Sequence, residues 1–266
     1  MTYPPLNTLK PVAEDIWLID GPVIRFLGLP FSTRATVVRL EGGGVWVHSP
    51  TELTDGLRAE IDALGPVRHL IAPNWLHYVR VAPWQAAYPD ALSWAAPGLT
   101  RRAAKKGLTL RFDRDLGDEA PPEWEGQIAQ MIVRGPAHSE AVFFHERSRT
   151  LILTDLIENF ETDRMAWWQR PIVWVAGIAD PDGKMPIDMA MSFSFRRRYL
   201  QRRIQQMIDW APERVILAHG RWYDRDGVKE LERAFRRVLP RDEGEINPKS
   251  LDARIRRIEA QRGRPK

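Results

Sequence analysis

Residues 135–155 read GPAHSEAVFFHERSRTLILTD, and this stretch carries the strongest signal for the fold. Its two runs of β-branched and aromatic residues, AVFFHE and TLILTD, flank a tight turn, and a third strand-like run at residues 128–135 precedes them. Three strands in such close succession predict an antiparallel meander. His138 lies in the first turn and Asp155 ends the last strand, so two ligand-type side chains are expected at the ends of neighbouring strands.

The sequence before the meander alternates between strand-like and helix-like patterns, which is typical of an α/β fold. A glycine triplet at 42–44 predicts a hairpin turn, and Ser49-Pro50-Thr51 reads as the start of an amphipathic helix. The buried run HLIAP at 69–73 follows that helix, so a strand parallel to its neighbour is expected. The remaining expected strands are 16–19, 35–40, 45–48 and 91–96, and the further helices are 81–88 and 100–107.

After the meander come a Trp-rich segment, a Pro/Gly/Asp turn at 180–186, a long helix carrying Leu200, a strand at 214–220 and a last amphipathic helix carrying Leu231. Neither an internal repeat nor a clean linker interrupts this order. We therefore expect one domain over residues 1–240, with residues 241–266 as a basic C-terminal appendage.

Composition limits the chemistry that the chain can perform. The 266 residues include no Cys and six His, which excludes disulfide frameworks, thiolate catalysis and every metal site built on Cys. The net charge of +4 is uneven, because residues 196–266 carry 20 Lys/Arg and 11 Asp/Glu. The longest apolar stretch, at 171–179, is far shorter than the roughly 20 residues of a spanning helix. We expect a cytoplasmic protein with no membrane partner.

Four candidate metal ligands stand where strands end and loops begin, the places at which α/β folds build their sites. They are His77, His138, Asp155 and His219, the last in the strand-end sequence ILAHG. Each alone is also compatible with a structural role, because His beside a strand is often only hydrogen-bonded and Asp after a strand often caps a turn. Their order along the chain has more weight than any single residue.

This order resembles the metallo-β-lactamase-fold superfamily over roughly residues 10–240. The segment GPAHSEAVFFHERSRTLILTD is similar to the family's turn His and metal-bridging Asp, and ILAHG is similar to its final His. The opening strands and VWVHSP resemble the family's first hairpin, with His48 where an Asp is usual. The resemblance implies a four-layer αββα sandwich, and APNWLHY points to a branch known only as a domain of unknown function.

The chain departs from the family at its His-x-His-x-Asp-His cluster. With His77 aligned as the last residue of the cluster, Ala72, Asn74 and Leu76 stand where the family has His, His and Asp. By this resemblance one metal site keeps only His138 and Asp155, while the other keeps three ligands. The loss of a carboxylate at Leu76 removes the group that the family uses to orient water. Residues expected around the site or its pocket are His48, Asn74, Trp75, Tyr78 and Trp222.

The resemblance implies a metal-dependent hydrolase with a reduced, mononuclear site and a small-molecule substrate. His77, Asp155 and His219 would hold one zinc or another divalent ion, with His138 as a fourth ligand or transition-state donor, and His77 and Asp155 are the catalytic candidates. One alternative is an inactive member of the fold without metal, in which the same residues form a hydrogen-bonded network.

A further alternative, which we rank last, is binding of nucleic acid or another anionic partner through the Arg-rich C-terminal region. The interleaved acidic residues and the packing expected of the aromatic residues argue against it. Its candidate residues are Arg196, Arg197, Arg198, Arg202, Arg203, Arg236, Arg237, Arg254, Arg256 and Arg257. Glycine-rich nucleotide loops and the Gly-x-Ser-x-Gly elbow are absent from the sequence.

Overall fold

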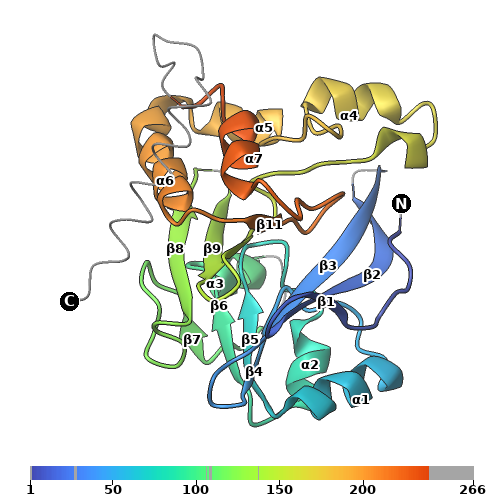
Figure 1. The fold of residues 1–266 in the computed structure, drawn as a ribbon, viewed down its shortest axis with the longest axis vertical. Coiled ribbons are helices and arrows are strands. Elements are labelled where there is room, and N and C mark those ends of the chain that lie inside the picture. The colour runs from blue at the N-terminus through green and yellow to red at the C-terminus, as the bar shows by residue number, and fades with distance from the viewer. Residues whose placement is uncertain (1, 27–28, 106, 108–109, 137, 240–266) are drawn as a thin grey trace.

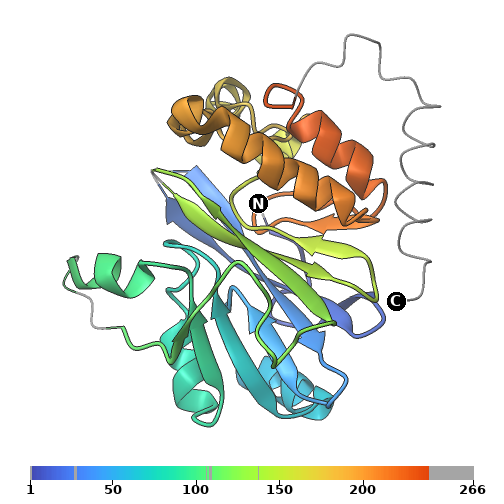
Figure 2. The same ribbon diagram turned by 90° about the vertical axis from the view of Figure 1, so that its left-hand side faces the viewer.

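The computed structural model describes residues 2–26, 29–105, 107, 110–136 and 138–239. Two β-sheets pack face to face, and helices cover the outer face of each (Figures 1 and 2). The result is the four-layer αββα sandwich that the sequence predicts. The C-terminal appendage, predicted for residues 241–266, lies outside the described residues.

The first sheet has seven strands in the order of the chain, β1-β2-β3-β4-β5-β6-β7. Its first four strands are antiparallel neighbours, whereas β4, β5, β6 and β7 run parallel, as expected for strands separated by helical crossovers. The strands are β1 (Lys10–Ala13), β2 (Ile16–Phe26), β3 (Leu29–Arg39), β4 (Val45–His48), β5 (Val67–Ala72), β6 (Leu92–Ala95) and β7 (Arg114–Asp115).

The second sheet has the order β11-β10-β9-β8 and contains the predicted meander. Strand β9 is antiparallel to both β8 and β10, and β11 then joins the edge parallel to β10. The strands are β8 (Ile128–Arg134), β9 (Ser139–His145), β10 (Thr150–Ile152) and β11 (Arg214–Ile216).

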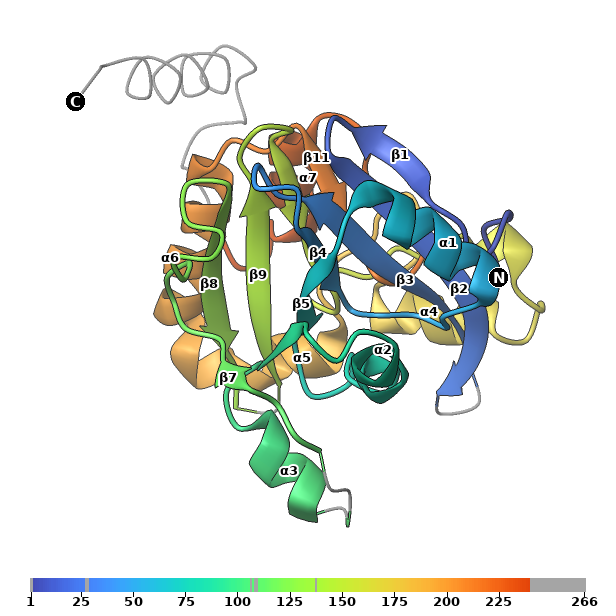
Figure 3. The ribbon, with the colours of Figure 1, turned by 90° about the horizontal axis from the view of Figure 1, so that it is seen from below.

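Helices α1 (Asp55–Leu64) and α2 (Val81–Ala87) pack on the outer face of the first sheet, seen from below in Figure 3. Helices α6 (Arg197–Asp209) and α7 (Gly227–Ala234) cover the second sheet. The other helical segments are α3 (Leu99–Lys105), η1 (Thr162–Arg164), α4 (Arg170–Ala176), α5 (Ile187–Ser192) and η2 (Ser194–Arg196). Within the described residues, every helix is too short or too polar to cross a bilayer.

Strand alternation sends neighbouring residues of one strand into different hydrophobic clusters. Trp46 points into the core between the sheets, while its neighbours Val45 and Val47 pack against α1 and α2. In the same way Phe143 joins the core between the sheets, and Phe144 packs under α6. Strands of both sheets are apolar on both faces because each sheet is covered on both sides.

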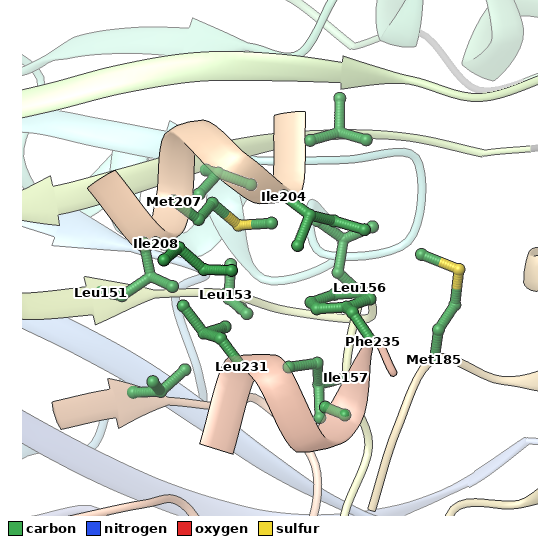
Figure 4. Packing of buried hydrophobic residues seen from close by; sticks show 14 of the residues in the cluster. Leu151, Leu153, Leu156, Ile157, Met185, Ile204, Met207, Ile208, Leu231 and Phe235 are labelled. Carbon is green, nitrogen blue, oxygen red and sulfur yellow. The ribbon is translucent and has the colours of Figure 1, made fainter. Parts of the chain in front are cut away.

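The core beneath α6 and α7 holds the loop that follows β10 (Figure 4). Leu153, Leu156 and Ile157 pack there with Ile204 of α6 and Leu231 of α7. This packing immobilises the backbone on both sides of Asp155, a candidate ligand.

The structure corrects two local predictions. Helix α1 begins at Asp55, capped by the Thr54 hydroxyl, which accepts a hydrogen bond from the Leu57 amide, so Ser49-Pro50-Thr51 is not its start. Helix α4 lies in the Trp-rich segment and α5 follows the turn at 180–186, and we had predicted neither as a helix.

Candidate metal centre

The four candidate ligands lie in loops at one edge of the sandwich. His77 comes five residues after β5, and His138 lies between β8 and β9. Asp155 and His219 lie three residues beyond the ends of β10 and β11, and not in the strands themselves as the sequence suggested. Because β10 and β11 are parallel neighbours, the loops that follow them place these two side chains next to each other.

The Asp155 carboxylate is the centre of the group. The Nε2 atoms of His77 and His219 each lie 3.2 Å from its Oδ1 atom. The Nε2 atom of His138 lies 3.5 Å from the other oxygen, Oδ2. Two ligands that each lie about 2.1 Å from a tetrahedral zinc are roughly 3.4 Å apart, so these separations match those within one coordination shell.

The opposite ring nitrogens of two histidines are held by other groups. The Nδ1 atom of His77 lies 2.7 Å from the Ser49 hydroxyl. The Nδ1 atom of His219 lies 2.6 Å from the Ser32 carbonyl oxygen, to which it donates. A histidine that donates through Nδ1 presents the lone pair of Nε2, which is the usual arrangement of metal-bound histidine. Both rings thus direct Nε2 toward Asp155.

Asn74 connects the loop of His77 to the loop of Asp155. Its side-chain oxygen accepts hydrogen bonds from the backbone amides of Leu76 and His77, both at 2.8 Å. Its amide nitrogen donates to Asp155 Oδ2 at 2.6 Å and to the Thr154 hydroxyl at 2.8 Å. Asn74 is fully buried and uses both ends of its side chain, so it fixes the relative position of the two loops.

The Glu140 side chain fixes the backbone of the Asp155 loop through hydrogen bonds. One carboxylate oxygen accepts from the Thr154 amide at 2.6 Å, and the other accepts from the amides of Asp155 and Leu156 at 2.8 and 3.1 Å. Glu140 is fully buried. Three amide donors on one buried carboxylate make a strong local constraint.

Electrostatics couple the four groups. Burial would raise the pKa of Asp155, but the adjacent His77 and His219 hold that pKa well below its usual value. Burial would lower the pKa of His219, yet the hydrogen bond and charge of Asp155 outweigh it and raise the pKa. The pKa of His138 is also raised, because Glu140 and Asp155 outweigh burial. Without a metal, positive charge on His138 and His219 is favoured beside the carboxylate.

The residues present fit one divalent ion better than two. The Nε2 atom of His138 is buried and has no hydrogen-bond partner within the described part of the chain, as a ligand atom facing a metal would. His77, Asp155 and His219 form one group of two nitrogens and a carboxylate oxygen, all within 4.8 Å of one another, which is a ligand set that zinc accepts. A second group joins His138, Glu140 and Asp155, but both oxygens of Glu140 are taken by backbone amides.

The other residues predicted around the site differ in burial and in what they contact. His48 is buried in the core between the sheets, where its ring stacks on Trp46 and burial lowers its pKa to about 3. Trp75 lies over the edge of His138, with ring centroids 6.2 Å apart, and donates to the Pro97 carbonyl.

Tyr78 packs on the small core beside α3, and Trp222 packs on the core between the sheets. Leu76, which stands where the family has a carboxylate, is exposed. Tyr78 and Trp222 therefore have packing roles in the described structure.

Sequence reasoning missed Glu140, Ser32, Ser49 and Glu158. Glu140 stands two residues after His138 in GPAHSE, so alternation along the start of β9 could have placed it on the same side as His138. Burial raises the pKa of Glu158 to about 8. The charge of His219 lowers this pKa and the charge of Asp155 raises it further. No sequence signal identifies Ser32, because its carbonyl meets His219 only through the tertiary fold.

Solved structures share this architecture. The chain is similar to the DIM-1 metallo-β-lactamase exposed to ceftazidime, with 14% identity, a TM-score of 0.60, and coverage of 86% of this chain and 95% of that one. It is similar to a metallo-β-lactamase from Hirschia baltica, with 14% identity, a TM-score of 0.59 and coverage of 88% and 98%. FIM-1 from Pseudomonas aeruginosa in its mono-zinc form gives 13% identity, a TM-score of 0.57 and coverage of 88% and 96%. The fold is that of the metallo-β-lactamases.

The chain belongs to the family described as a domain of unknown function, DUF4336, whose model matches residues 13–173. No curated protein matches the chain. The match spans β2 to β7 of the first sheet, the meander and three of the four candidate ligands, whereas His219 lies beyond it.

Proposed function

We propose that the protein is a metal-dependent hydrolase that acts on a small molecule with one divalent ion, of which zinc is the best candidate. The observation that carries the proposal is the convergence of three imidazole Nε2 atoms on one carboxylate, at 3.2, 3.2 and 3.5 Å. His77, Asp155 and His219 would hold the ion, with His138 as a fourth ligand or as a donor to the reacting group.

The surrounding contacts support this arrangement. Ser49 and the Ser32 carbonyl orient two of the rings, Asn74 holds Asp155, and Glu140 holds its backbone. Such outer contacts fix ring orientation and ligand basicity in metal sites. Both ring nitrogens of His77 and His219 are thus positioned, as they are in metal-bound histidine.

When bound, the ion would supply a water of lowered pKa and polarise the substrate carbonyl or phosphoryl oxygen. The chain's own residues position that chemistry. Asp155 orients the histidines, and Asn74 limits its rotation by donating to Oδ2. His138, whose Nε2 has no hydrogen-bond partner within the described residues, can donate a hydrogen bond to developing negative charge on an ester, thioester, lactone or phosphodiester.

The alternative is a metal-free member of the fold. It is favoured by the Asn74 amide, which already satisfies one oxygen of Asp155 at 2.6 Å. In that case the raised pKa values of His138 and His219 would stabilise an ion-paired network in place of a metal. Metal binding distinguishes the two functions directly.

The test is metal analysis of protein purified without chelator, followed by zinc titration of chelator-treated protein by calorimetry. We expect one zinc per chain in the wild type and loss of the site in Asp155→Ala. Ser49→Ala should weaken zinc binding by about 10- to 100-fold, because it removes only the orienting contact. His145→Gln is a matched control, since His145 is also buried but contacts Ser148 outside the site.

Activity is then screened on ester, thioester, lactone and phosphodiester substrates. We expect turnover that chelation abolishes and zinc restores. Binding of no metal by correctly folded wild-type protein would refute the proposal and favour the metal-free network. Turnover that survives loss of all four ligands would refute both.

A further inference from the structure

A short segment around α4 exposes an unusual amount of apolar surface. Trp167, Trp174 and Val175 have 79%, 61% and 78% of their surface exposed, and Trp168 and Ile172 are also exposed. Residues 166–176 read AWWQRPIVWVA, so Arg170 is the only charged residue among them. Exposed apolar patches of this kind mark interaction sites.

A second exposed stripe follows on α5 and η2. Ile187, Met191 and Phe195 are spaced four residues apart, which places them on one face of the helical segment. All three are exposed, and Phe195 is completely so. The opposite side of this segment is anchored by buried Met189 and Phe193, so the exposed stripe faces away from the core.

Both segments lie at the same end of the molecule (Figure 1). Helix α4 is anchored by Val173, which packs in a small cluster with Phe160 and Phe31. The Phe31 ring in turn meets the His219 ring edge-on, with centroids 5.0 Å apart. The first segment is therefore connected by packing to the candidate metal centre.

The second segment reaches the other side of that centre. A Cβ atom at Gly135 would lie 2.7 Å from the Phe193 ring, so Phe193 packs tightly on the turn that carries His138. The two segments, 166–176 and 187–198, which we call the apolar rim, thus flank the site from two directions.

Positive charge accompanies the apolar rim. Arg196, Arg197 and Arg198 follow Phe195 directly and are exposed, and Arg170 lies between the tryptophans. Asp188 is the only acidic residue in the two segments. Arg197 reaches backbone carbonyls of the C-terminal turn, whereas no ion pair within the described residues involves Arg196 or Arg198.

We propose that the apolar rim binds an anionic lipid surface. Tryptophan favours the boundary between lipid headgroups and acyl chains, and exposed aliphatic side chains beside it can enter that boundary. Arginine next to such residues is attracted to anionic headgroups. A second copy of the chain suits this surface less well, because symmetric contact would bring the arginine clusters together.

The expectation of no membrane partner rested on the absence of a spanning segment, and binding to a lipid surface requires none. The proposal does not depend on hydrolase activity. The rim would hold the edge of the sandwich that carries His138 and His219 toward the lipid.

The experiment is cosedimentation of the full chain with vesicles of phosphatidylcholine alone or of phosphatidylcholine and phosphatidylglycerol in equal parts. We expect binding to the anionic vesicles that weakens at high salt. The double variant Trp167→Ser/Val175→Ser should lower this binding by at least about 10-fold, because about 1.4 kcal/mol of lost burial is tenfold. Arg196→Glu/Arg198→Glu should lower binding to the anionic vesicles by at least about 10-fold.

Arg58→Glu is the matched control, because this side chain is exposed and lies outside the rim, on α1 at the other end of the molecule (Figure 1). Circular dichroism checks that each variant folds. Absence of vesicle binding, or equal binding by rim and control variants, would overturn the proposal. A dimer in solution that only the rim variants dissociate, without vesicle binding, would assign the surface to a second copy and also overturn it.

Discussion

Replacement of Glu140 by glutamine tests whether the loop that carries Asp155 depends on a buried carboxylate. The side chain accepts three backbone hydrogen bonds, from residues 154, 155 and 156, at 2.6, 2.8 and 3.1 Å. Glutamine has almost the same shape but presents one oxygen and one NH₂ group. The NH₂ group must then face at least one backbone amide, so donor meets donor.

The expected loss follows from these contacts. Hydrogen bonds to a charged group contribute about 1.5–3 kcal/mol each, against about 1 kcal/mol for neutral ones. Glu140→Gln weakens two bonds and removes the third, which predicts a loss of about 3 to 5 kcal/mol in the free energy of unfolding. That is a large part of the roughly 5–15 kcal/mol typical of a domain.

Glu158→Gln is the matched control, because Glu158 is also a buried glutamate of this region. Burial raises the pKa of Glu158 from 4.5 to about 8, so the folded protein keeps its proton at neutral pH. A raised carboxyl pKa means that stability is highest below pH 4.5 and decreases as the pH rises through 8. The wild type therefore loses up to about 3 kcal/mol at pH 7, and glutamine avoids this loss.

The assay is urea unfolding of metal-free protein at pH 4.5 and pH 7. At pH 7 we expect Glu140→Gln to be destabilised and Glu158→Gln to be unchanged or stabilised by up to about 3 kcal/mol, with this gain absent at pH 4.5. Equal losses in the two variants would refute the reasoning, as would a loss below about 0.5 kcal/mol for Glu140→Gln.

Three further predictions concern other parts of the fold. Gly220→Ala should lose about 2 to 4 kcal/mol of unfolding free energy, because φ is +81° and a Cβ atom would lie 2.0 Å from the Asn159 carbonyl oxygen; wild-type stability would contradict this strain. Leu231→Ala should lose about 2 to 5 kcal/mol in urea unfolding, because Leu231 is fully buried beneath α6, and a loss below about 1 kcal/mol would mean that the core collapses to fill the cavity. Burial lowers the pKa of His69 from 6.5 to about 4, so stability should fall as the pH falls from 6.5 through 4, and His69→Gln should flatten this part of the pH profile.

Local sequence patterns were sufficient for most of the elements. The meander follows from two short turns between β-rich runs, and the parallel direction of β5 follows from the helix before it. The start of α1 was predicted too early, because Ser49-Pro50-Thr51 resembles a helix cap. The hydroxyl that accepts a hydrogen bond from the first turn of the helix is that of Thr54. Helices α4 and α5 were missed because their exposed apolar residues lack the polar face of an ordinary surface helix.

The sequence by itself nominated His77, His138, Asp155 and His219, because strand ends are set by local patterns and the order of these residues is visible in one dimension. The sandwich followed from the resemblance of that order to the metallo-β-lactamase fold. Only the tertiary structure decided how they meet. His219 reaches Asp155 because parallel pairing of β10 and β11 brings together loops more than sixty residues apart. His77 reaches the same carboxylate from the other sheet, where Asn74 links its loop to that of Asp155. The supports from Ser32 and Glu140, and the exposure of the apolar rim, depend on packing between distant segments, which no local pattern encodes.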